Sequence, residues 1–324
     1  MTPPFHSRIS GLAARTLQRL RSAVSGRLID PRNYQPPLPL PGGLSRAQIH
    51  DALTAVSIDG SASGELFGYA SSDLDRFLYT LAMVPEGAVG KALEIGANPY
   101  FNTLLLRQFR PELELTLVNY FGPGSAQGKQ TVSFPGFKGV ADAVTFQYDN
   151  VNIESAALPY PDDSFDYVVF CEVLEHMTHD PLRSMLELKR VLKQGGTMIL
   201  TTPNAARLEN ISAFLEGRNM YDPFSAYGPY GRHNREYTRH ELHMLMTHCG
   251  FEVEASFTGN VHPDIPLGQA DASTLNRLIG QVRHREHDLG QYLFTRWANA
   301  RVASEKLPNW LYRSYPAERM AEGQ

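Results

Sequence analysis

Short apolar runs alternate with segments of helical spacing over most of the chain. The apolar runs predict strands at 92–95, 113–118, 144–148, 167–170, 197–201, 251–257 and 291–297. Between two of them, residues 182–192 place their apolar side chains on one face of a helix. Strands that alternate with helices in this way are typical of βαβ units. The pattern therefore predicts an α/β fold with a mostly parallel sheet.

Capping residues mark the expected helix ends. Asp180 stands where it can cap the helix that precedes the fifth strand, and the glycines at 195–196 are expected to end that helix. Thr238 and Glu241 form a capping-box pattern for a later helix, which should stop at Gly250. These signals set the helix boundaries independently of the apolar pattern.

The first 29 residues contain five arginines and no acidic residue, with apolar residues between them, which predicts a basic amphipathic helix. Such a helix could make a peripheral contact with an anionic membrane, act as an organelle transit peptide, pack on the main domain or form a frayed terminus. Prolines at 31–41 predict an extended linker. The expected organisation is therefore a helix and linker at 1–44, one large domain at 45–300 and a tail at 301–324.

Composition excludes several classes of protein. With 30 basic and 34 acidic side chains, the net charge of −4 provides no basic field for a nucleic-acid partner. The two cysteines, Cys171 and Cys249, suit neither a disulfide framework nor a zinc site, which favours a reducing, cytoplasmic compartment, and no metal is expected. No apolar run reaches the roughly 20 residues that a membrane-spanning helix needs. Oligomeric state does not follow from the sequence.

Ligands of open α/β sheets bind outside the carboxyl ends of the strands, where the strand order reverses. The turn after the first strand contains Gly96, which lets backbone approach a ligand closely, and a helix start near Tyr100 that offers free N–H groups. Glu94 could complement an ammonium group there. This turn is therefore the first place to expect a ligand.

Four motifs in this order resemble the class I S-adenosylmethionine-dependent methyltransferases, in particular those of type 11. They are ALEIG at 92–96, LPYPDDSFD at 158–166 running into VVFCEVLEH at 168–176, LKRVLKQGG at 188–196 and TPN at 202–204. The resemblance covers roughly residues 90 to 260. It implies a Rossmann-like, doubly wound, mostly parallel sheet of seven strands with an antiparallel last strand, and S-adenosylmethionine as the cofactor.

The resemblance also implies cofactor contacts at the ends of the first, second and fourth strands and shortly before the motif LPYPDDSFD. The residues are Glu94, Gly96, Ala97, Asn98, Asn119, Glu154, Cys171 and Glu172. Asn119 would meet the ribose hydroxyls, and Glu154 would lie near the adenine amino group. Three positions depart from the family pattern, in two ways. Asn98 and Tyr100 stand where further glycines are usual, and Asn119 replaces an acidic residue, so its hydrogen bond to ribose lacks a charge.

The acceptor side is expected in the loop 205–237, which is rich in aromatic and hydrogen-bonding side chains. Tyr227 and Tyr230 would form walls there, while Arg232 and Arg235 would bind the substrate. His176 and His233 are the candidates for a general base. A helical insertion at 261–288 would extend the acceptor pocket or form a dimer contact.

These observations favour a methyltransferase that acts on a hydroxyl oxygen of a small molecule or glycan. A catalytically silent binding module of the same fold is a second hypothesis, because of the depleted glycines and Asn119. A nicotinamide oxidoreductase is a third. It is disfavoured because the chain lacks the G-x-G-x-x-G spacing and the acidic ribose partner of that class.

Overall fold

The structure is a computed structural model that describes residues 30–221, 228, 230–262, 272–281, 285–304 and 306–311. The predicted basic helix at 1–29, the side chain of Tyr227 and the tail beyond residue 311 lie outside the described residues. The linker does not stay fully extended, because it forms two short 3-10 helices, η1 (Pro31–Tyr34) and η2 (Pro41–Gly43). Gln35, just after η1, accepts a hydrogen bond from the backbone N–H of Asn260 and so ties the linker to the main domain.

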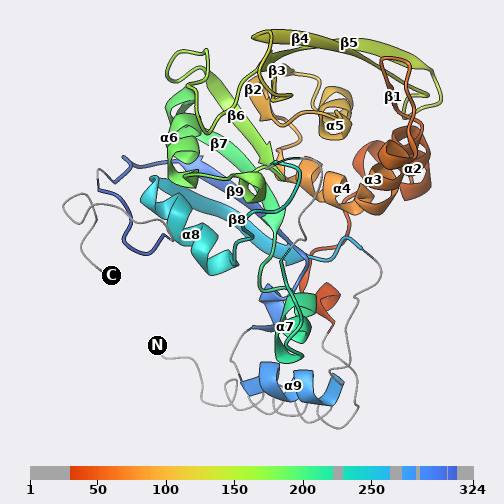
Figure 1. The fold of residues 1–324 in the computed structure, drawn as a ribbon. Helices are drawn as coiled ribbons and strands as arrows, with labels where there is room; N and C mark the ends of the chain where they lie inside the picture. The colour runs from red at the N-terminus through yellow and green to blue at the C-terminus, as the bar shows by residue number, and fades with distance from the viewer. Residues whose placement is uncertain are drawn as a thin grey trace, which may run out of the picture.

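Nine strands form one sheet in the order β1-β4-β5-β3-β2-β6-β7-β9-β8 (Figure 1). Their bounds are β1 Ser57–Ile58, β2 Gly90–Ile95, β3 Leu113–Asn119, β4 Gln127–Phe134, β5 Asp142–Asn150, β6 Phe165–Cys171, β7 Leu192–Pro203, β8 Phe251–Gly259 and β9 Tyr292–Asn299. Strands β5, β3, β2, β6 and β7 run parallel to one another, while β9 is antiparallel to both β7 and β8. The predicted mostly parallel sheet of seven strands, with an antiparallel last strand, is confirmed: it runs from β5 to β8, and β4 and β1 extend it beyond β5.

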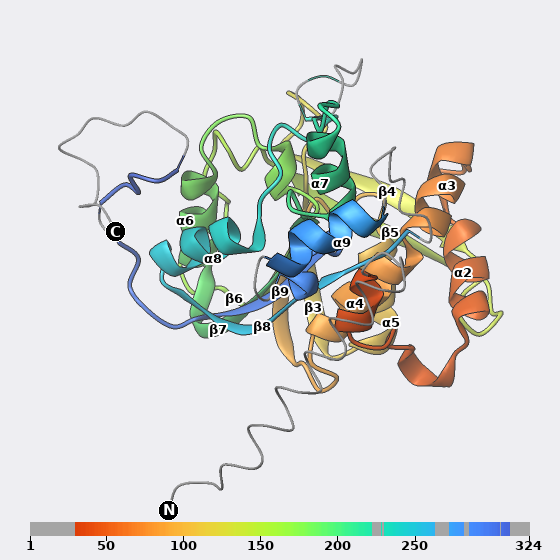
Figure 2. The same ribbon diagram turned by 90° about the horizontal axis from the view of Figure 1, so that it is seen from below.

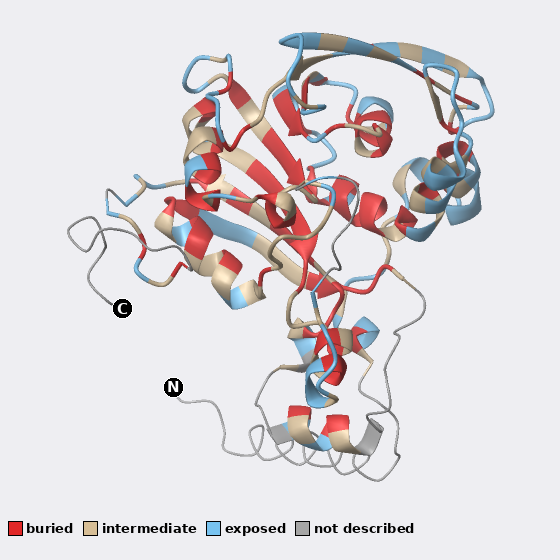
Figure 3. Cartoon of the chain, viewed as in Figure 1, coloured by how far each residue is buried: buried red, intermediate tan, exposed pale blue. Residues whose placement is uncertain are grey.

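Two further strands at the sheet edge were not predicted. β4 pairs with β5 in an antiparallel hairpin over the whole of its length, and the two residues of β1 pair with β4. The chain thus passes from β3 to β5 through a strand, where a doubly wound fold usually has a helix. In Figure 1 the hairpin forms the curved edge of the sheet and passes α5 on its way to β1. Exposed and partly buried residues alternate over the first five residues of β4, so this edge is partly solvated (Figure 3).

Helices cover both faces of the sheet and make a three-layer domain (Figure 2). One face carries α2 (Arg46–Thr54), α3 (Gly64–Ser72), α4 (Leu74–Met83) and α5 (Phe101–Phe109). The other carries α6 (Pro181–Val191) and α8 (Arg239–His248), and their apolar side chains pack against the strands in a second core cluster. The central strands are buried on both faces (Figure 3), as expected for parallel strands between two helical layers.

The capping signals explain most helix ends. The side chain of Asp180 accepts from the N–H of Leu182 at the start of α6, and Thr238 accepts from the N–H of Glu241 at the start of α8. The predicted end of α6 at 195–196 is too late, because β7 begins at Leu192, directly after the helix. The apolar side chains of this stretch continue into the sheet core, so burial overrides the glycine signal.

Beyond the sheet edge formed by the strand ends lie two helices, α7 (Leu208–Leu215) and α9 (Ala272–Gln281), side by side in Figures 1 and 2. α9 belongs to the predicted helical insertion. Leu208 of α7, Ile279 of α9 and Leu289 form a small core of their own. Within the described part of the chain, none of the helices has the length and apolar character that crossing a membrane requires.

Gly250 ends α8 with a φ of +83°, and a Cβ there would lie 2.4 Å from the carbonyl oxygen of Arg301. We expect Gly250→Ala to lower the free energy of unfolding through both the left-handed backbone and this overlap. Gly217→Ala is the matched control, since Gly217 has a φ of +68° but no atom within 4 Å of its Cβ position. In urea unfolding, the loss at Gly250 should exceed that at Gly217 by about 1 to 3 kcal/mol. Equal losses would contradict the overlap.

Candidate functional site

A hollow of about 240 Å³ opens at the carboxyl ends of β2, β3 and β6, where the strand order reverses. We refer to it as the rim hollow. Its walls combine apolar side chains with three amides, two carboxylates, an imidazole and two phenols. They are formed by Ile95, Gly96, Asn98, Val118, Asn119, Tyr120, Val151, Asn152, Ile153, Glu154, Glu172, Val173, His176, Met177 and Tyr230. A larger hollow, of about 630 Å³, lies between the linker, α4 and α5. Since residues 84–86 and 108–110 in its wall precede β2 and β3, it lies at the amino ends of these strands, away from the predicted site.

Gly96 forms the turn from β2 with a φ of +72°. A Cβ at this position would come within 2.8 Å of the side chain of Val173, which follows β6. The two strand ends therefore approach each other as closely as they do only because residue 96 has no side chain. The close approach of this backbone to a ligand stays a prediction.

The three residues that depart from the family pattern, Asn98, Tyr100 and Asn119, belong to one hydrogen-bonded network. The amide oxygen of Asn119 accepts from the N–H of Asn98, and its NH₂ group donates to the hydroxyl of Tyr100. Tyr100 in turn donates to Gln130 of β4, and its ring stacks on Phe146 of β5 at 5.0 Å. Tyr100 has a φ of +71°, a conformation that usually favours glycine. Its side chain is held there because the extra hairpin covers it.

Two of the predicted cofactor contacts, Glu94 and Ala97, do not line the rim hollow. The carboxyl group of Glu94 is buried and accepts a hydrogen bond of 2.6 Å from the hydroxyl of Thr103 in α5. Burial raises the pKa of Glu94 to about 7, although this hydrogen bond works in the opposite direction. Glu94 therefore changes charge near neutral pH directly behind the turn of Gly96.

Glu154 reaches the rim hollow, but its carboxylate faces the segment after β6. Its two oxygens accept from the backbone N–H groups of Thr178 and His179 and from the hydroxyl of Thr178, at 2.7 to 3.0 Å. Burial alone would raise the pKa of Glu154, but these hydrogen bonds lower it. In this structure the side chain anchors residues 178–179. A contact between Glu154 and a bound adenine stays a prediction.

At the end of β6, Cys171 is buried and lies outside the wall of the rim hollow, and burial raises the pKa of its thiol to about 12. It is therefore a neutral packing residue.

Glu172, which does line the hollow, has a φ of +54° and accepts from the hydroxyl of Thr201 at 2.7 Å. Arg76 of α4 lies 3.8 Å from Glu172 and also pairs with Asp73 at 2.9 Å. Burial raises the pKa of Glu172 to about 7 against the effect of Arg76.

Four hydrogen bonds join residues 175–176, after β6, to residues 232–235, before α8. The carbonyl of Glu175 accepts from the N–H groups of Asn234 and Arg235, and the side chain of Asn234 donates to the carbonyl of His176. In return, Nδ1–H of His176 donates to the carbonyl of Arg232 at 2.9 Å. We call this contact the 175–235 junction. It brings together two segments that are more than fifty residues apart in the chain.

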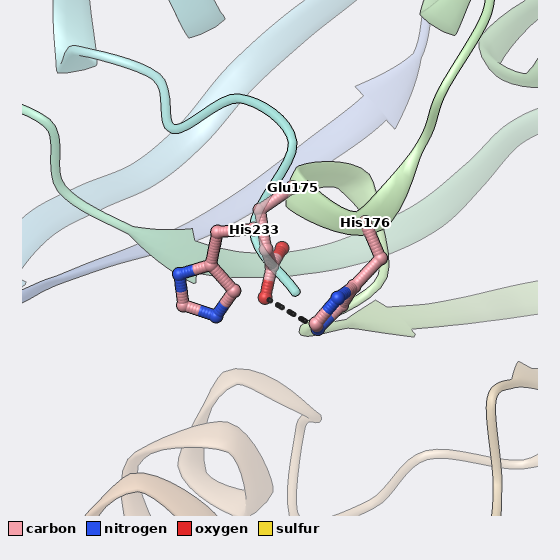
Figure 4. Close-up of side chains that lie close together, drawn as sticks. All are labelled: Glu175, His176 and His233. Atoms are coloured by element: carbon pink, nitrogen blue, oxygen red, sulfur yellow. Dashed lines mark ion pairs between the residues drawn. The ribbon is translucent and has the colours of Figure 1, made fainter. Parts of the chain in front are cut away.

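The junction places His176 and His233 with their ring centroids 5.1 Å apart, on either side of the carboxylate of Glu175 (Figure 4). Glu175 is fully buried. Its Oε2 accepts from the hydroxyl of Thr202 at 2.9 Å, while Oε1 lies 3.8 Å from Nε2 of His176. Burial raises the pKa of Glu175, and the charge of His233 opposes this shift.

A second pocket, of about 450 Å³, lies on the other side of His233, between the end of β7, α7 and the start of β9. We call it the polar pocket, because most of its lining side chains carry hydrogen-bonding groups: Pro203, Arg207, Glu209, Asn210, His233, Glu236, His262, Gln291 and Tyr292. His176 lines the rim hollow and His233 lines the polar pocket. The histidine pair therefore belongs to the wall between the two.

The predicted substrate residues have different surroundings from those expected. Tyr230 lines the rim hollow, accepts from Asn152 and meets Tyr120 edge to face at 5.8 Å. Arg235 forms an ion pair with Glu241 of α8 and lies over the ring of Tyr237. Neither Arg232 nor Arg235 lines either pocket.

The sequence placed the acceptor side in the loop 205–237, and five residues of that loop, Arg207, Glu209, Asn210, His233 and Glu236, line the polar pocket. Of these, only His233 was named in advance. Gln291 and Tyr292, which no motif connects to the loop, were missed. Glu175 had a usable signal, since it stands beside His176 and three residues after Glu172 in the motif CEVLEH.

Comparisons with known proteins agree with this geometry. The family model described as "Methyltransferase domain" matches residues 65–256. Over 115 residues the chain is 36% identical to a protein of Mycolicibacterium smegmatis named as a probable S-adenosylmethionine-dependent methyltransferase, a match that covers 34% of this chain and 39% of that protein. It is 32% identical over 173 residues to a malonyl-[acyl-carrier protein] O-methyltransferase of Paenibacillus, covering 52% of this chain and 55% of the relative. The chain thus spans about two fifths to one half of these relatives.

Among solved structures, the N-methyltransferase NodS of Bradyrhizobium japonicum, in complex with S-adenosyl-L-homocysteine, is 14% identical. The match covers 74% of this chain and 93% of the NodS chain, with a TM-score of 0.41. The family match, by contrast, covers more than half of the chain, including β2 to β7 and the whole rim hollow. The chain belongs to the methyltransferase-domain family, the class I methyltransferases that depend on S-adenosylmethionine.

Proposed function

We propose that this protein transfers a methyl group from S-adenosylmethionine to a hydroxyl oxygen of a small polar acceptor such as a saccharide. One observation carries the proposal: two pockets meet at the wall that contains His176 and His233. The rim hollow takes the methyl donor and the polar pocket takes the acceptor. The wall between them is then the place where the methyl group passes.

The residues of the rim hollow fit S-adenosylmethionine. The missing Cβ of Gly96 leaves backbone at the floor, where a side chain would meet Val173. Apolar side chains after β3 and β5 suit an adenine ring, and the amides of Asn98, Asn119 and Asn152 suit ribose and amino-acid groups. The amide of Asn119 offers hydrogen bonding without charge, so its part in holding ribose is worth about 0.5 to 1.5 kcal/mol.

The polar pocket favours a polyhydroxylated acceptor. Asn210, Gln291 and Arg207 offer donors, Glu209 and Glu236 offer acceptors, and the ring of Tyr292 offers a flat apolar wall. One oxygen of Glu209, Oε2, is buried and has no hydrogen-bond partner among the described residues. A hydroxyl group of a bound sugar would supply the donor that this oxygen lacks. The Paenibacillus relative and a ubiquinone/menaquinone C-methyltransferase of Ectopseudomonas mendocina are named for different acceptors, so the assignment rests on this pocket.

S-adenosylmethionine supplies a methyl group on a positively charged sulfur, which is reactive enough that alignment of the acceptor is the main task. The two pockets provide this alignment by holding the acceptor beside the donor, and such positioning can be worth about 7 to 11 kcal/mol. His176 and His233 stand where a hydroxyl would lose its proton. Imidazole is the side chain that exchanges a proton most readily near neutral pH.

A direct test combines binding and transfer. We expect S-adenosylhomocysteine to bind the full chain in calorimetry, and tritium from methyl-labelled S-adenosylmethionine to appear in at least one of a panel of methyl glycosides. Binding without transfer to any sugar or polyol would favour the hypothesis of a catalytically silent module. If S-adenosylhomocysteine does not bind below millimolar concentration, the proposed donor site is wrong.

Ionised Glu94 should attract the ammonium group of the bound cofactor from behind the Gly96 turn. Because the pKa of Glu94 is about 7, the affinity for S-adenosylhomocysteine should rise between about pH 6 and pH 8, by roughly three- to tenfold. Glu94→Gln should reduce this rise to the part that Glu172 contributes, since the pKa of Glu172 is also about 7 and its side chain lines the rim hollow. Glu112→Gln, an exposed control, should keep the whole rise. Calorimetry at three pH values measures the effect. An affinity of the native protein that does not change with pH would contradict the role of Glu94.

His233→Ala should lower the rate of methyl transfer by about 100- to 10,000-fold, the usual contribution of a proton acceptor. The affinity for S-adenosylhomocysteine should stay unchanged, because His233 lines the polar pocket and not the rim hollow. His240→Ala, which removes an exposed histidine of α8, is the control for both measurements. Loss of cofactor binding in His233→Ala would place this residue on the donor side instead.

A further inference from the structure

Glu175, His176 and His233 form a compact set of metal-ligating side chains (Figure 4). One ligand atom from each lies within 4.8 Å of the others. The sequence had given no reason to expect a metal, because two of these residues are neighbours in the chain and the third follows 57 positions later. Only the 175–235 junction brings them together.

The carboxylate of Glu175 points to a missing partner. The residue is completely buried, yet no group in the described ranges donates a hydrogen bond to Oε1. The distance of 3.8 Å between Oε1 and Nε2 of His176 is too long for a hydrogen bond. A buried carboxylate oxygen without a donor costs free energy. A bound cation between Glu175 and the two rings would remove that cost.

Both imidazole rings are held in the tautomer that a metal requires. Nδ1–H of His176 donates to the carbonyl of Arg232, and Nδ1–H of His233 donates to the carboxylate of Glu236 at 3.0 Å. A neutral ring with its proton on Nδ1 carries its lone pair on Nε2. Metal-ligating histidines almost always donate their other N–H to a carbonyl or carboxylate in this manner, which fixes the ring and increases its basicity.

We propose that Glu175, His176 and His233 bind one divalent transition-metal ion at the wall between the rim hollow and the polar pocket. Two imidazole nitrogens and one carboxylate oxygen suit ions such as Mn²⁺, Fe²⁺ and Co²⁺ better than Mg²⁺, which prefers oxygen ligands alone. Three protein ligands leave coordination positions open.

The catalytic consequence rests on the proposed function. An acceptor hydroxyl bound to the ion has a lowered pKa and loses its proton to solvent. Its oxygen then forms the bond to the methyl carbon while the bond from that carbon to sulfur breaks, and the electron pair stays on sulfur. In that case His176 and His233 act as ligands and not as bases. Two open positions would also hold adjacent hydroxyl groups, as in a sugar.

Mn²⁺ titration tests the site without donor or acceptor. The full, untagged chain is freed of metal with a chelator and titrated with Mn²⁺, and free Mn²⁺ is measured by electron paramagnetic resonance. We expect one Mn²⁺ per chain. His233→Ala and Glu175→Gln should each weaken Mn²⁺ binding at least tenfold, because each removes a ligand. Glu236→Gln should weaken it by roughly 10- to 100-fold, because the hydrogen bond that holds the ring of His233 is weakened. His240→Ala, the control, should not change it. Equal binding in all variants, or no saturable binding by the native chain, would overturn the proposal.

Two further measurements separate possible failures. Calorimetry with S-adenosylhomocysteine on each variant reports whether the fold and the rim hollow survive. A loss of Mn²⁺ binding counts against the ligand only in a variant that still binds S-adenosylhomocysteine. If Glu175→Gln does not fold, His233→Ala, whose substitution lies outside the rim hollow, provides the comparison. Saturable Mn²⁺ binding without methyl transfer to any acceptor would refute the proposed function but support the metal site. Methyl transfer at an unchanged rate in excess chelator would overturn the catalytic part assigned to the metal.

Discussion

The geometry of the site depends on the hydrogen-bonded junction between residues 175–176 and 232–235. Three backbone carbonyls and the partly exposed ring of His176 join the end of β6 to the segment before α8. Since Glu175 also accepts from Thr202 of β7, the ends of two neighbouring strands and the loop beyond them are fixed relative to one another. The wall between the two pockets is therefore rigid at the point where chemistry is proposed, and each pocket is built on a separate side of it.

The central sheet was accessible from the sequence because its parallel strands are buried on both faces and so appear as continuous apolar runs. The edge was not. β4 alternates exposed and partly buried residues in a polar sequence, QGKQTVSF, and its pairing with β5 is decided by tertiary structure. This hairpin also explains Tyr100, which replaces a family glycine. The ring gains a stacking partner, Phe146, and a hydrogen-bond acceptor, Gln130, that exist only because the hairpin is present.

The candidate site also has one part that the sequence indicated and another that it did not. Gly96, Glu172 and His176 lie in motifs, Asn98 and Asn119 lie outside them but also beside strand ends, and all five line the rim hollow. On the acceptor side, the sequence indicated the loop 205–237 but not which side chains face the pocket. Arg235 looked like a substrate anchor because of its charge in a loop, but its charge is paired with Glu241 on the adjoining helix. Gln291 and Tyr292 reach the polar pocket only through the antiparallel position of β9 beside β7, which residue type alone does not reveal.

The most direct test of this account is a crystal structure of the protein with S-adenosylhomocysteine. We expect the ligand to occupy the rim hollow, with adenine among the apolar side chains after β3 and β5 and with the sulfur facing His176 and the polar pocket beyond it. A sulfur atom directed away from this wall, or a ligand bound instead in the larger hollow between the linker, α4 and α5, would contradict the central claim that the two pockets meet for methyl transfer.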